Sequence, residues 1–479
     1  MMGSGMVLSH CDALEVQSVT DTLGREWAIL GFAVQTEPGA PDPVGALRES
    51  TSHAEEVVRT WTGRWALIGS DVLHPDPTAM LGCFYRIIED GPRAGVWISS
   101  SVALLAGLVG SPSPGPLREP LDWGSGVDWF PPPTSRYKGI RRVLPSQALE
   151  FAEGMVTPRR RKVPEPVRPS RSSEEIAAAV ERRLVTALRN IARSSNGTPW
   201  LALTAGKDSR LLLAAARAAG VEVRTFTQEL PFYRWNLSDR TLPPLLSEKV
   251  GYEHRFIRAE SLERDLLRLW DEHTAGQSVE TDRVFIARRQ WDPIPPGSTV
   301  LRAGVFETAQ CAEHSILPPV ARDSGEMLDC LARWAVFSGR PLTSDQAGAL
   351  SEWLNWINED VGSGLDWRDR FYMEQRVGGW LSSVEQGLDC TGRRSLHPAN
   401  CSALLEDLLA FDPSMRVTFD HHEMLIERMA PELLEYPINP PDNWSRRLAG
   451  RVMREGYRLT HARHAGGYFR DLGYRIRHR

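Results

Sequence analysis

The sequence predicts an α/β protein with a strand-rich N-terminal part followed by a doubly wound parallel sheet and a helical C-terminal part. Before residue 158, short apolar runs lie between turn residues, and after residue 172, strand patterns alternate with helical ones. The intervening residues are rich in Pro, Arg and Ser without apolar periodicity. We therefore expect a domain over 1–157, a solvated linker over 158–172 and a domain over 173–479.

The expected strands of the first part are buried runs of apolar residues. They cover 27–34, 65–69 and 96–100, with turns at 75–77 and 90–92. In the second part, Ser172 and Glu175 form a capping box, and apolar residues then recur at helical spacing up to Leu188. Strand patterns follow at 200–204, 221–227, 254–257 and 299–303.

Composition excludes several classes of partner. The net charge of -5 provides no general attraction for nucleic acid or membrane surfaces. No apolar run approaches the ~20 residues of a membrane span, and residues 1–11 lack an export signal, so we expect a cytoplasmic protein.

The six cysteines have no metal-type spacing and are expected to be free thiols. The arginine-rich segment 444–479 is either a solvated helix or a surface for nucleic acid or acidic peptide.

The residues Thr204-Ala205-Gly206-Lys207-Asp208-Ser209 are the strongest functional signal. They lie between the apolar run 200–203 and a helical stretch rich in alanine and leucine. A glycine turn between a strand and a helix directs backbone N–H groups and the positive end of the helix at one point, which favours a phosphate. Lys207 is either a phosphate ligand or a solvated turn lysine.

This stretch resembles the pyrophosphate-binding loop Ser-Gly-Gly-x-Asp-Ser of the ATP pyrophosphatase superfamily. Thr204 replaces the first serine and keeps its hydroxyl, and Ala205 replaces the first glycine and keeps a small side chain. The stretch lacks the Gly-Lys-Ser/Thr ending of a Walker-type loop.

The order of motifs along the chain resembles the asparagine synthetase-like family of amide ligases, which includes β-lactam synthetases and lasso peptide cyclases. Residues 63–67, 97–105 and 139–146 are similar to three segments of the family's first domain. The resemblance implies a layered glutaminase-like (αββα) domain before the ATP pyrophosphatase domain. Met2 stands where glutamine-using members carry their cysteine nucleophile, and the first cysteine is Cys11. We therefore expect the nitrogen to come from free ammonia or a substrate amine, and not from glutamine hydrolysed by this domain.

The resemblance implies an ATP-dependent, AMP-forming ligase that uses Mg²⁺. It would adenylate a carboxylate of a small molecule or peptide and join it to an amine, in specialised metabolism. We expect neither membrane nor nucleic acid as a partner, and a homodimer and a separate partner protein both stay open.

The resemblance also assigns binding roles to individual residues. Asp208 and Glu307 are the expected metal ligands. Arg302 is either an added phosphate clamp or a surface ion-pair residue, and Asp239 is either the family's acidic residue or a helix cap. The expected ATP-binding residues are Leu203, Thr204, Ala205, Gly206, Lys207, Asp208, Ser209, Thr227, Arg302 and Gly304.

The catalytic residue of the amide-forming step is the largest departure from the family. Family members use a late lysine, but this chain has no lysine after Lys249. Segments 372–376, 395–400 and 419–426 still resemble the family, and the lysine would fall at or beside His422. The candidate catalytic residues are His422, His421 and Glu374, with packing or capping as the alternative for the histidines and a structural ion pair with Arg376 for Glu374.

Two other functions remain open. A nucleic-acid-modifying enzyme, such as a tRNA thiolase, would use the same loop, and Cys311 together with the basic segment 444–479 favours it. A non-catalytic binding or scaffolding subunit is favoured by the missing lysine and by the altered segment 300–307, which keeps one glycine and one carboxylate.

Overall fold

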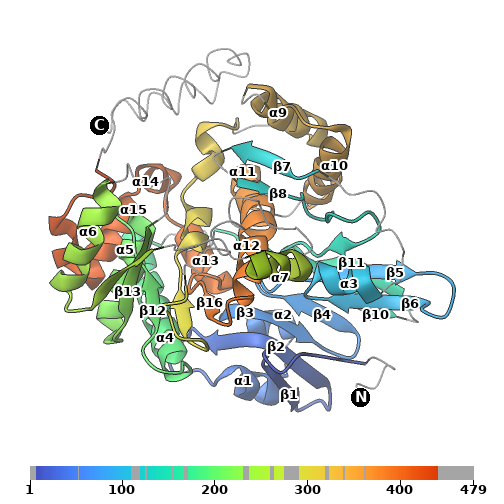
Figure 1. Cartoon of the computed structure of the whole chain (residues 1–479), viewed down its shortest axis with the longest axis horizontal. Coiled ribbons are helices and arrows are strands. Elements are labelled where there is room, and N and C mark those ends of the chain that lie inside the picture. Colours follow the sequence, from blue (N-terminus) through green and yellow to red (C-terminus); the bar gives the residue numbers. More distant parts are fainter. Residues whose placement is uncertain are drawn as a thin grey trace.

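The computed structural model contains antiparallel sheets in its N-terminal half and a parallel sheet flanked by helices in its C-terminal half (Figure 1). The structure describes residues 7–51, 53–108, 119–124, 127–152, 155–166, 171–229, 237–258, 264–274, 291–318, 323–337, 340–360 and 363–440. Within these residues, no helix is both long and apolar enough to cross a bilayer. The arginine-rich segment 444–479 lies outside them.

The N-terminal half is built on two antiparallel sheets that pack on each other through Leu73, Tyr85 and Leu149. The six-stranded sheet has the order β1 (Val16–Thr20), β2 (Glu26–Gln35), β3 (Trp61–Ile68), β4 (Val72–Pro75), β10 (Gln147–Ala152) and β11 (Met155–Arg160). The three-stranded sheet has the order β6 (Gly95–Ser99), β5 (Phe84–Ile88) and β9 (Arg141–Arg142), and a hairpin comprises β7 (Leu121–Gly124) and β8 (Val127–Trp129). The helices are α1 (Pro43–Glu49), α2 (Ala54–Val58) and α3 (Val102–Leu108). The strands predicted at 27–34, 65–69 and 96–100 are confirmed as β2, β3 and β6.

The parallel sheet has the order β14 (His254–Arg258), β13 (Arg224–Glu229), β12 (Trp200–Ala202), β15 (Thr299–Leu301) and β16 (Arg394–Leu396). Its first four strands confirm the predicted ones, while β16 was not predicted. Successive residues of β12 face opposite sides, as the strand geometry requires. Trp200 belongs to the core that contains Trp270 and Val384, and Leu201 belongs to the core that contains Leu212.

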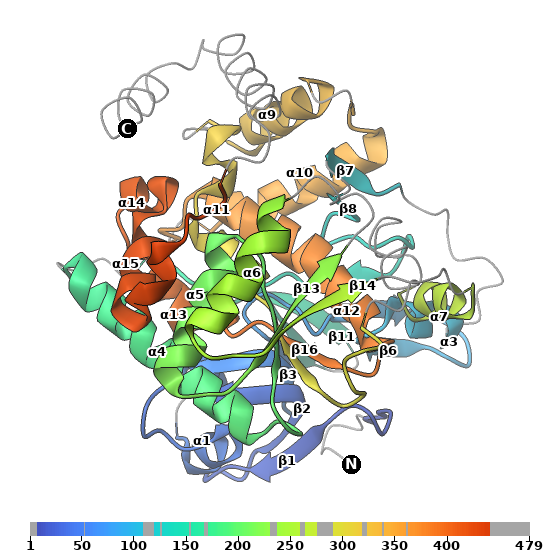
Figure 2. The ribbon, with the colours of Figure 1, turned by 60° about the vertical axis from the view of Figure 1, so that its left-hand side comes forward.

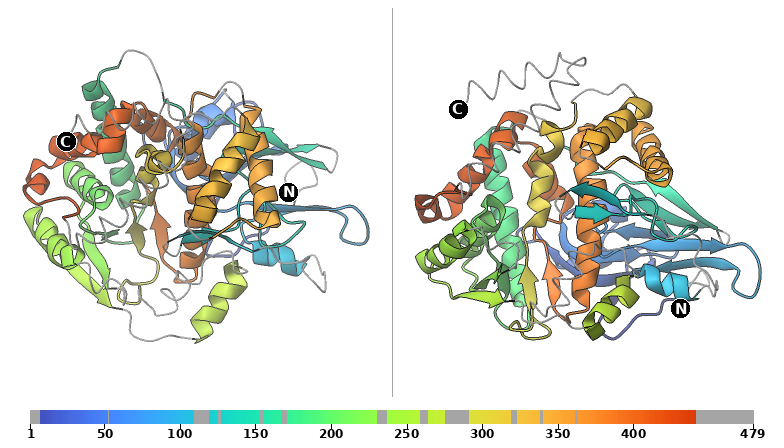
Figure 3. Two further views of the ribbon diagram at one scale, coloured as in Figure 1. Left: turned by 90° about the horizontal axis from the view of Figure 1, so that it is seen from above. Right: turned by 45° about the horizontal axis from the view of Figure 1, so that its top comes forward.

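Helices cover the parallel sheet. The capping box of Ser172 and Glu175 is confirmed at the start of α4 (Ser173–Arg193), which packs beside α5 (Lys207–Ala219) and α15 (Asp420–Met429) (Figure 2). The other elements of this half are α6 (Leu237–Lys249), α7 (Arg264–Thr274), η2 (Gly304–Ala309), η3 (Ala312–Ser315), α9 (Ser324–Phe337), α10 (Ser344–Asn358), α11 (Trp367–Phe371), the π-helix η4 (Tyr372–Leu381), α12 (Ser382–Asp389), α13 (Ser402–Leu409), α14 (Pro413–Thr418) and η5 (Pro431–Glu435). The pair α9 and α10 packs against the hairpin of β7 and β8 through Trp123, Trp129 and Trp353 (Figure 3).

The predicted linker begins inside a strand, which corrects its solvated interpretation. Residues 158–160 pair with β10 as the end of β11. Arg161 is buried and donates a hydrogen bond to the Pro75 carbonyl, and Arg160 bonds the Trp356 carbonyl in α10. The basic side chains therefore bind backbone carbonyls of other segments, which their sequence pattern did not indicate.

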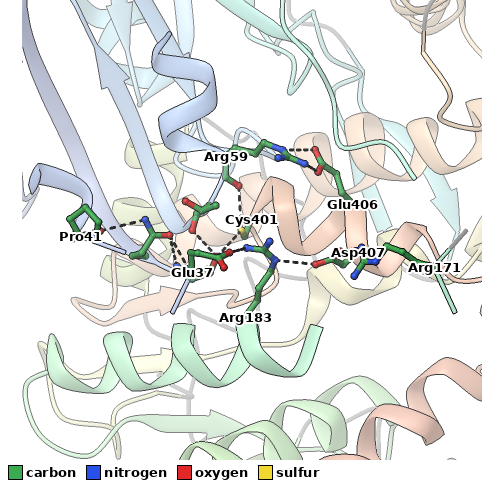
Figure 4. Close-up of polar contacts among 11 residues, drawn as sticks. Glu37, Pro41, Arg59, Arg171, Arg183, Cys401, Glu406 and Asp407 are labelled. Atoms are coloured by element: carbon green, nitrogen blue, oxygen red, sulfur yellow. Dashed lines mark hydrogen bonds and ion pairs between the residues drawn. The ribbon is translucent and has the colours of Figure 1, made fainter. Parts of the chain in front are cut away.

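A polar network joins the two halves (Figure 4). Arg59, just after α2, pairs with Glu406 of α13, and Arg183 of α4 pairs with Asp407 at 3.0 Å. Arg183 also pairs with Glu37, just after β2. Because α4 and α13 pack against each other, these pairs hold the N-terminal sheet against the helical layer of the parallel sheet.

Two glycines offer a matched test of the packing between α12 and α7. A Cβ on Gly387 would lie 1.9 Å from the buried Trp270 ring, whereas a Cβ on Gly348 in α10 would meet nothing within 4 Å. We expect Gly387→Ala to lower the free energy of unfolding by about 1–3 kcal/mol through overpacking. Gly348→Ala should raise it by about 0.5–1 kcal/mol because alanine favours a helix. Urea unfolding measures both, and equal effects would contradict the packing.

Candidate functional site

The loop 204–209 lies at the carboxyl end of β12, the central strand of the parallel sheet. The next strand along the chain, β13, pairs with one edge of β12, and the later β15 pairs with the other edge. The direction of winding therefore reverses at β12. In open α/β sheets, the crevice outside such a reversal is where ligands bind.

Backbone and side-chain hydrogen bonds shape the loop. The Asp239 carboxylate in the first turn of α6 accepts a hydrogen bond from the Ala205 N–H at 2.6 Å. The Ser209 hydroxyl accepts from the Thr204 N–H at 3.1 Å, which closes the turn on itself. Gly206 is the N-cap of α5 and has no side-chain capping bond. The start of this 13-residue helix therefore presents its backbone donors toward the loop.

Arg210, directly after the loop, ties it to residues 433–437 by hydrogen bonds, and it was not predicted as a site residue. Its buried guanidinium donates to the carbonyls of Leu433, Tyr436 and Pro437 at 3.0, 2.6 and 2.8 Å. The Ala205 carbonyl accepts from the Asn439 N–H at 3.2 Å. Burial lowers the pKa of Arg210 to about 10. In the sequence, Arg210 directly follows the motif, but the carbonyl groups that it binds lie more than two hundred residues later, so no local pattern indicates its role.

A chain of hydrogen bonds joins Asp208 to the two histidines of α15. His422 Nε2 lies 2.9 Å from Asp208 Oδ1, His422 Nδ1 lies 2.9 Å from His421 Nε2, and His421 Nδ1 lies 3.0 Å from the Met415 carbonyl. Both ends of this chain are acceptors, so its three bonds need three N–H protons from two imidazoles. One of the histidines must therefore be an imidazolium when Asp208 is ionised.

His422 is the histidine that contacts the Asp208 carboxylate. Burial and the neighbouring His422 hold the pKa of His421 well below its usual range, so His421 is neutral. Burial acts to raise the pKa of Asp208, but the hydrogen bond and charge of His422, with Lys207, outweigh it and lower that pKa. His422 Nε2 and Asp208 Oδ1 stand at ion-pair distance, and Gln310 also donates a hydrogen bond to Asp208.

Glu307 provides a second carboxylate next to the loop. It lies in η2, directly after β15, and accepts a hydrogen bond from the Tyr372 hydroxyl at the start of η4. Burial, followed by the charge of Asp208, raises the pKa of Glu307. The negative charge of Asp208 therefore opposes ionisation of Glu307, and a bound cation would relieve this repulsion.

Lys207 lies on the open side of the loop, where its ammonium stands 3.8 Å from the centroid of the Phe419 ring. Phe419 caps α15 with a φ of 72°, a strained conformation for a large side chain. Thr227 lies beneath the loop, and its hydroxyl donates to the Leu203 carbonyl at 2.7 Å. Gly304 opens η2 beside this edge of the sheet.

Two predicted site residues are engaged elsewhere. Arg302 forms an ion pair with the buried Glu385 of α12, although about a quarter (27%) of its side chain remains exposed. Glu374 is fully buried and binds Arg370 at 3.0 Å and the Trp353 indole at 2.7 Å. Its predicted partner Arg376 instead lies 3.8 Å from Glu313. The structure therefore gives Glu374 a core role and does not place it with Asp208 and His422.

No family model matches the chain, and no curated protein matches it.

The proton count of the histidine chain can be tested by NMR of selectively ¹⁵N-labelled histidine. At pH 7 we expect His422 to carry protons on both ring nitrogens and His421 on Nδ1 alone, because their acceptors are fixed. Single His421→Asn and His422→Asn variants assign the signals. A neutral His422 in the parent protein would contradict the ion pair with Asp208.

Glu307 should make the folded state less stable as pH rises. Its folded pKa lies above its unfolded value of 4.5, so the folded state loses stability as pH climbs from 4.5 through the folded pKa. Glu307→Gln keeps an acceptor for Tyr372 and removes the charge. We expect urea unfolding to show a gain in stability for Glu307→Gln at pH 8 that shrinks toward pH 4. The exposed Glu352→Gln is the control, and an equal pH response of both variants would refute the burial of charge at Glu307.

Proposed function

We propose that this protein is an ATP-dependent, AMP-forming ligase of the asparagine synthetase type, which adenylates a carboxylate and transfers it to an amine. One observation carries the proposal: the reversal point of the parallel sheet gathers a glycine turn, two carboxylates and an imidazole. These are the groups needed to hold a triphosphate, its metal ion and a developing negative charge.

The phosphate groups would lie against the N-terminus of α5. Among the described residues, a Cβ on Gly206 would lie 3.1 Å from Thr204 Oγ1 and 3.6 Å from Asn439 Oδ1, so a side chain here would crowd the loop, whereas glycine leaves its backbone N–H groups accessible to a phosphate. Lys207 extends from the same turn and can swing from the Phe419 ring to a phosphate. With the β- and γ-phosphates held here, the α-phosphorus would face the substrate carboxylate.

Asp208 and Glu307 would hold Mg²⁺. Both offer carboxylate oxygens, which this ion prefers, and the raised pKa of Glu307 beside Asp208 marks a place where negative charge lacks compensation. When bound, the ion would neutralise charge on the departing pyrophosphate. Asp208 has a double role in this proposal because it also contacts His422 Nε2 at 2.9 Å and so orients that ring.

His422 would supply the positive charge that the family's late lysine supplies. It is buried, is oriented by His421 on one side and stands at hydrogen-bond distance from Asp208 on the other. A fixed cation stabilises negative charge that develops in the transition state of acyl transfer. In this proposal, His421 is a positioning residue, because it contacts His422 and the Met415 carbonyl.

The two packed antiparallel sheets of the N-terminal half support a layered, glutaminase-like arrangement in this proposal. Because Met2 stands where glutamine-using members carry their cysteine nucleophile, the amine would come from ammonia or from an amine on a substrate.

Calorimetric titration with Mg·ATP tests the phosphate site. We expect the parent to bind and two variants to lose binding: Gly206→Val, which fills the approach to the loop, and Asp208→Ala, which removes a metal ligand and the partner of His422. Asp345→Ala, which breaks an exposed ion pair with Lys138, is the control. Circular dichroism confirms that each variant is folded. A parent that does not bind would overturn the site and favour the scaffold alternative.

Adenylation is tested separately by exchange of labelled pyrophosphate into ATP in the presence of a panel of carboxylates. We expect exchange that depends on the carboxylate and is lost in Gly206→Val. Mg·ATP binding without exchange for any carboxylate, or ATP turnover that requires RNA, would replace the ligase proposal with one of the alternative functions.

A further inference from the structure

We propose that Cys311, His314 and Asp369 form a binding site for a zinc-class divalent cation, separate from the Mg·ATP site. A ligand atom from each of these residues lies within 4.8 Å of the other two. His314 Nε2 and Asp369 Oδ1 are 3.0 Å apart. Tetrahedral zinc ligands stand roughly 3.3–3.7 Å from one another, as bond lengths of about 2.0–2.3 Å require, so small side-chain movements suffice.

The sequence places these residues in two short elements. Cys311 and His314 have Cys-x-x-His spacing around the start of η3, and Asp369 lies on α11. Cys311 has a φ of 52°, a conformation that few residues with a side chain adopt outside turns and functional sites. The spacing of the cysteines alone does not indicate this group, because its other two ligands are a histidine and an aspartate.

The donor set selects the class of metal. One sulfur, one imidazole nitrogen and one carboxylate oxygen suit a borderline ion such as zinc, whereas magnesium prefers oxygen ligands alone. The group is also well enclosed, with Cys311 only 4% and Asp369 only 2% exposed. Asp366 Oδ1 lies 3.9 Å from His314 Nε2, but it accepts hydrogen bonds from the Arg368 backbone N–H and guanidinium and would have to release the guanidinium to act as a fourth ligand.

The donor atoms of the group are placed to share one cation, although Arg416 and Arg368 already pair with carboxylates beside it. Within the described part of the chain, Cys311 Sγ makes no hydrogen bond, so its sulfur is available to a metal. Binding would release the thiol proton to solvent and move the ring proton of neutral His314 from Nε2 to Nδ1, so that one thiolate, one carboxylate and a neutral imidazole bind the divalent ion. Arg416 holds the other Asp369 oxygen at 2.6 Å and can keep it while Oδ1 turns to the metal.

The position of the group gives the metal a structural role. Cys311 directly follows Gln310, which donates to Asp208 in the ATP site. Arg416 also donates to the Ala309 carbonyl at 2.9 Å, so α14, η2 and α11 meet at this point. A metal here would hold the segment that carries Glu307 and Gln310 against α11. The metal proposal does not rest on ATP binding, since its ligands are different residues.

Metal binding is measured on the full chain after dialysis against a chelator. Zinc is titrated in competition with a chromophoric chelator, and cobalt(II) is titrated as a spectroscopic probe of thiolate ligation. We expect about one equivalent of tight zinc, a sulfur-to-cobalt charge-transfer band and a rise in the melting temperature with zinc. Cys311→Ser and His314→Asn should weaken zinc binding by about tenfold or more, and Cys311→Ser should abolish the band.

Cys330→Ser is the matched control, because Cys330 is equally buried and lies on α9 away from these ligands. It should leave zinc affinity and the cobalt spectrum unchanged. If Cys311→Ser is poorly folded, His314→Asn with intact thiols gives the same test through affinity and thermal shift. The proposal is overturned if the parent binds no zinc under these conditions, or if Cys311→Ser and Cys330→Ser have the same effect.

Discussion

The placement of β12 between β13 and β15 is the constraint on which the rest of the candidate site depends. Trp200 is anchored in one core and Leu201 in the opposite core, so the strand cannot shift without exposing large side chains. With β12 held, its carboxyl end positions the loop 204–209 and the N-terminus of α5. Because β12 and β15 are parallel and paired in register, η2, which follows β15, begins at the same end of the sheet as the loop.

The site concentrates charges that a core ordinarily excludes. Asp208 and Glu307 stand near each other, and the pair Asp208–His422 is largely removed from solvent. Unpaired buried charge costs free energy: Asp208 contacts His422, whereas Glu307 accepts a hydrogen bond from the uncharged Tyr372 hydroxyl and has a raised pKa. Such arrangements are characteristic of functional sites, because the opposed pKa shifts prepare a place for a cation or for a charged transition state.

Long-range contacts complete the site from the C-terminal part of the described chain. Arg210 ties the loop to residues 433–437, α15 delivers His422, and η4 delivers Tyr372. A π-helix such as η4 shifts the side-chain register within a helix and often accompanies a functional residue. The halves are further locked by the pairs of Arg59 and Arg183 with α13, so the antiparallel sheets and the parallel sheet support one another.

Local patterns in the sequence were enough to predict the α/β class, the capping box at Ser172, four of the five parallel strands and the strand–turn–helix around Gly206. These features depend on neighbouring residues, so periodicity and capping report them directly. The strand β16 was missed because three residues carry too little pattern, and the linker was misjudged because Arg160 and Arg161 find carbonyl partners far along the chain. The meeting of Asp208 with His422, the engagement of Arg302 by Glu385 and the approach of Asp369 to Cys311 arise from packing between distant elements, which no local pattern encodes.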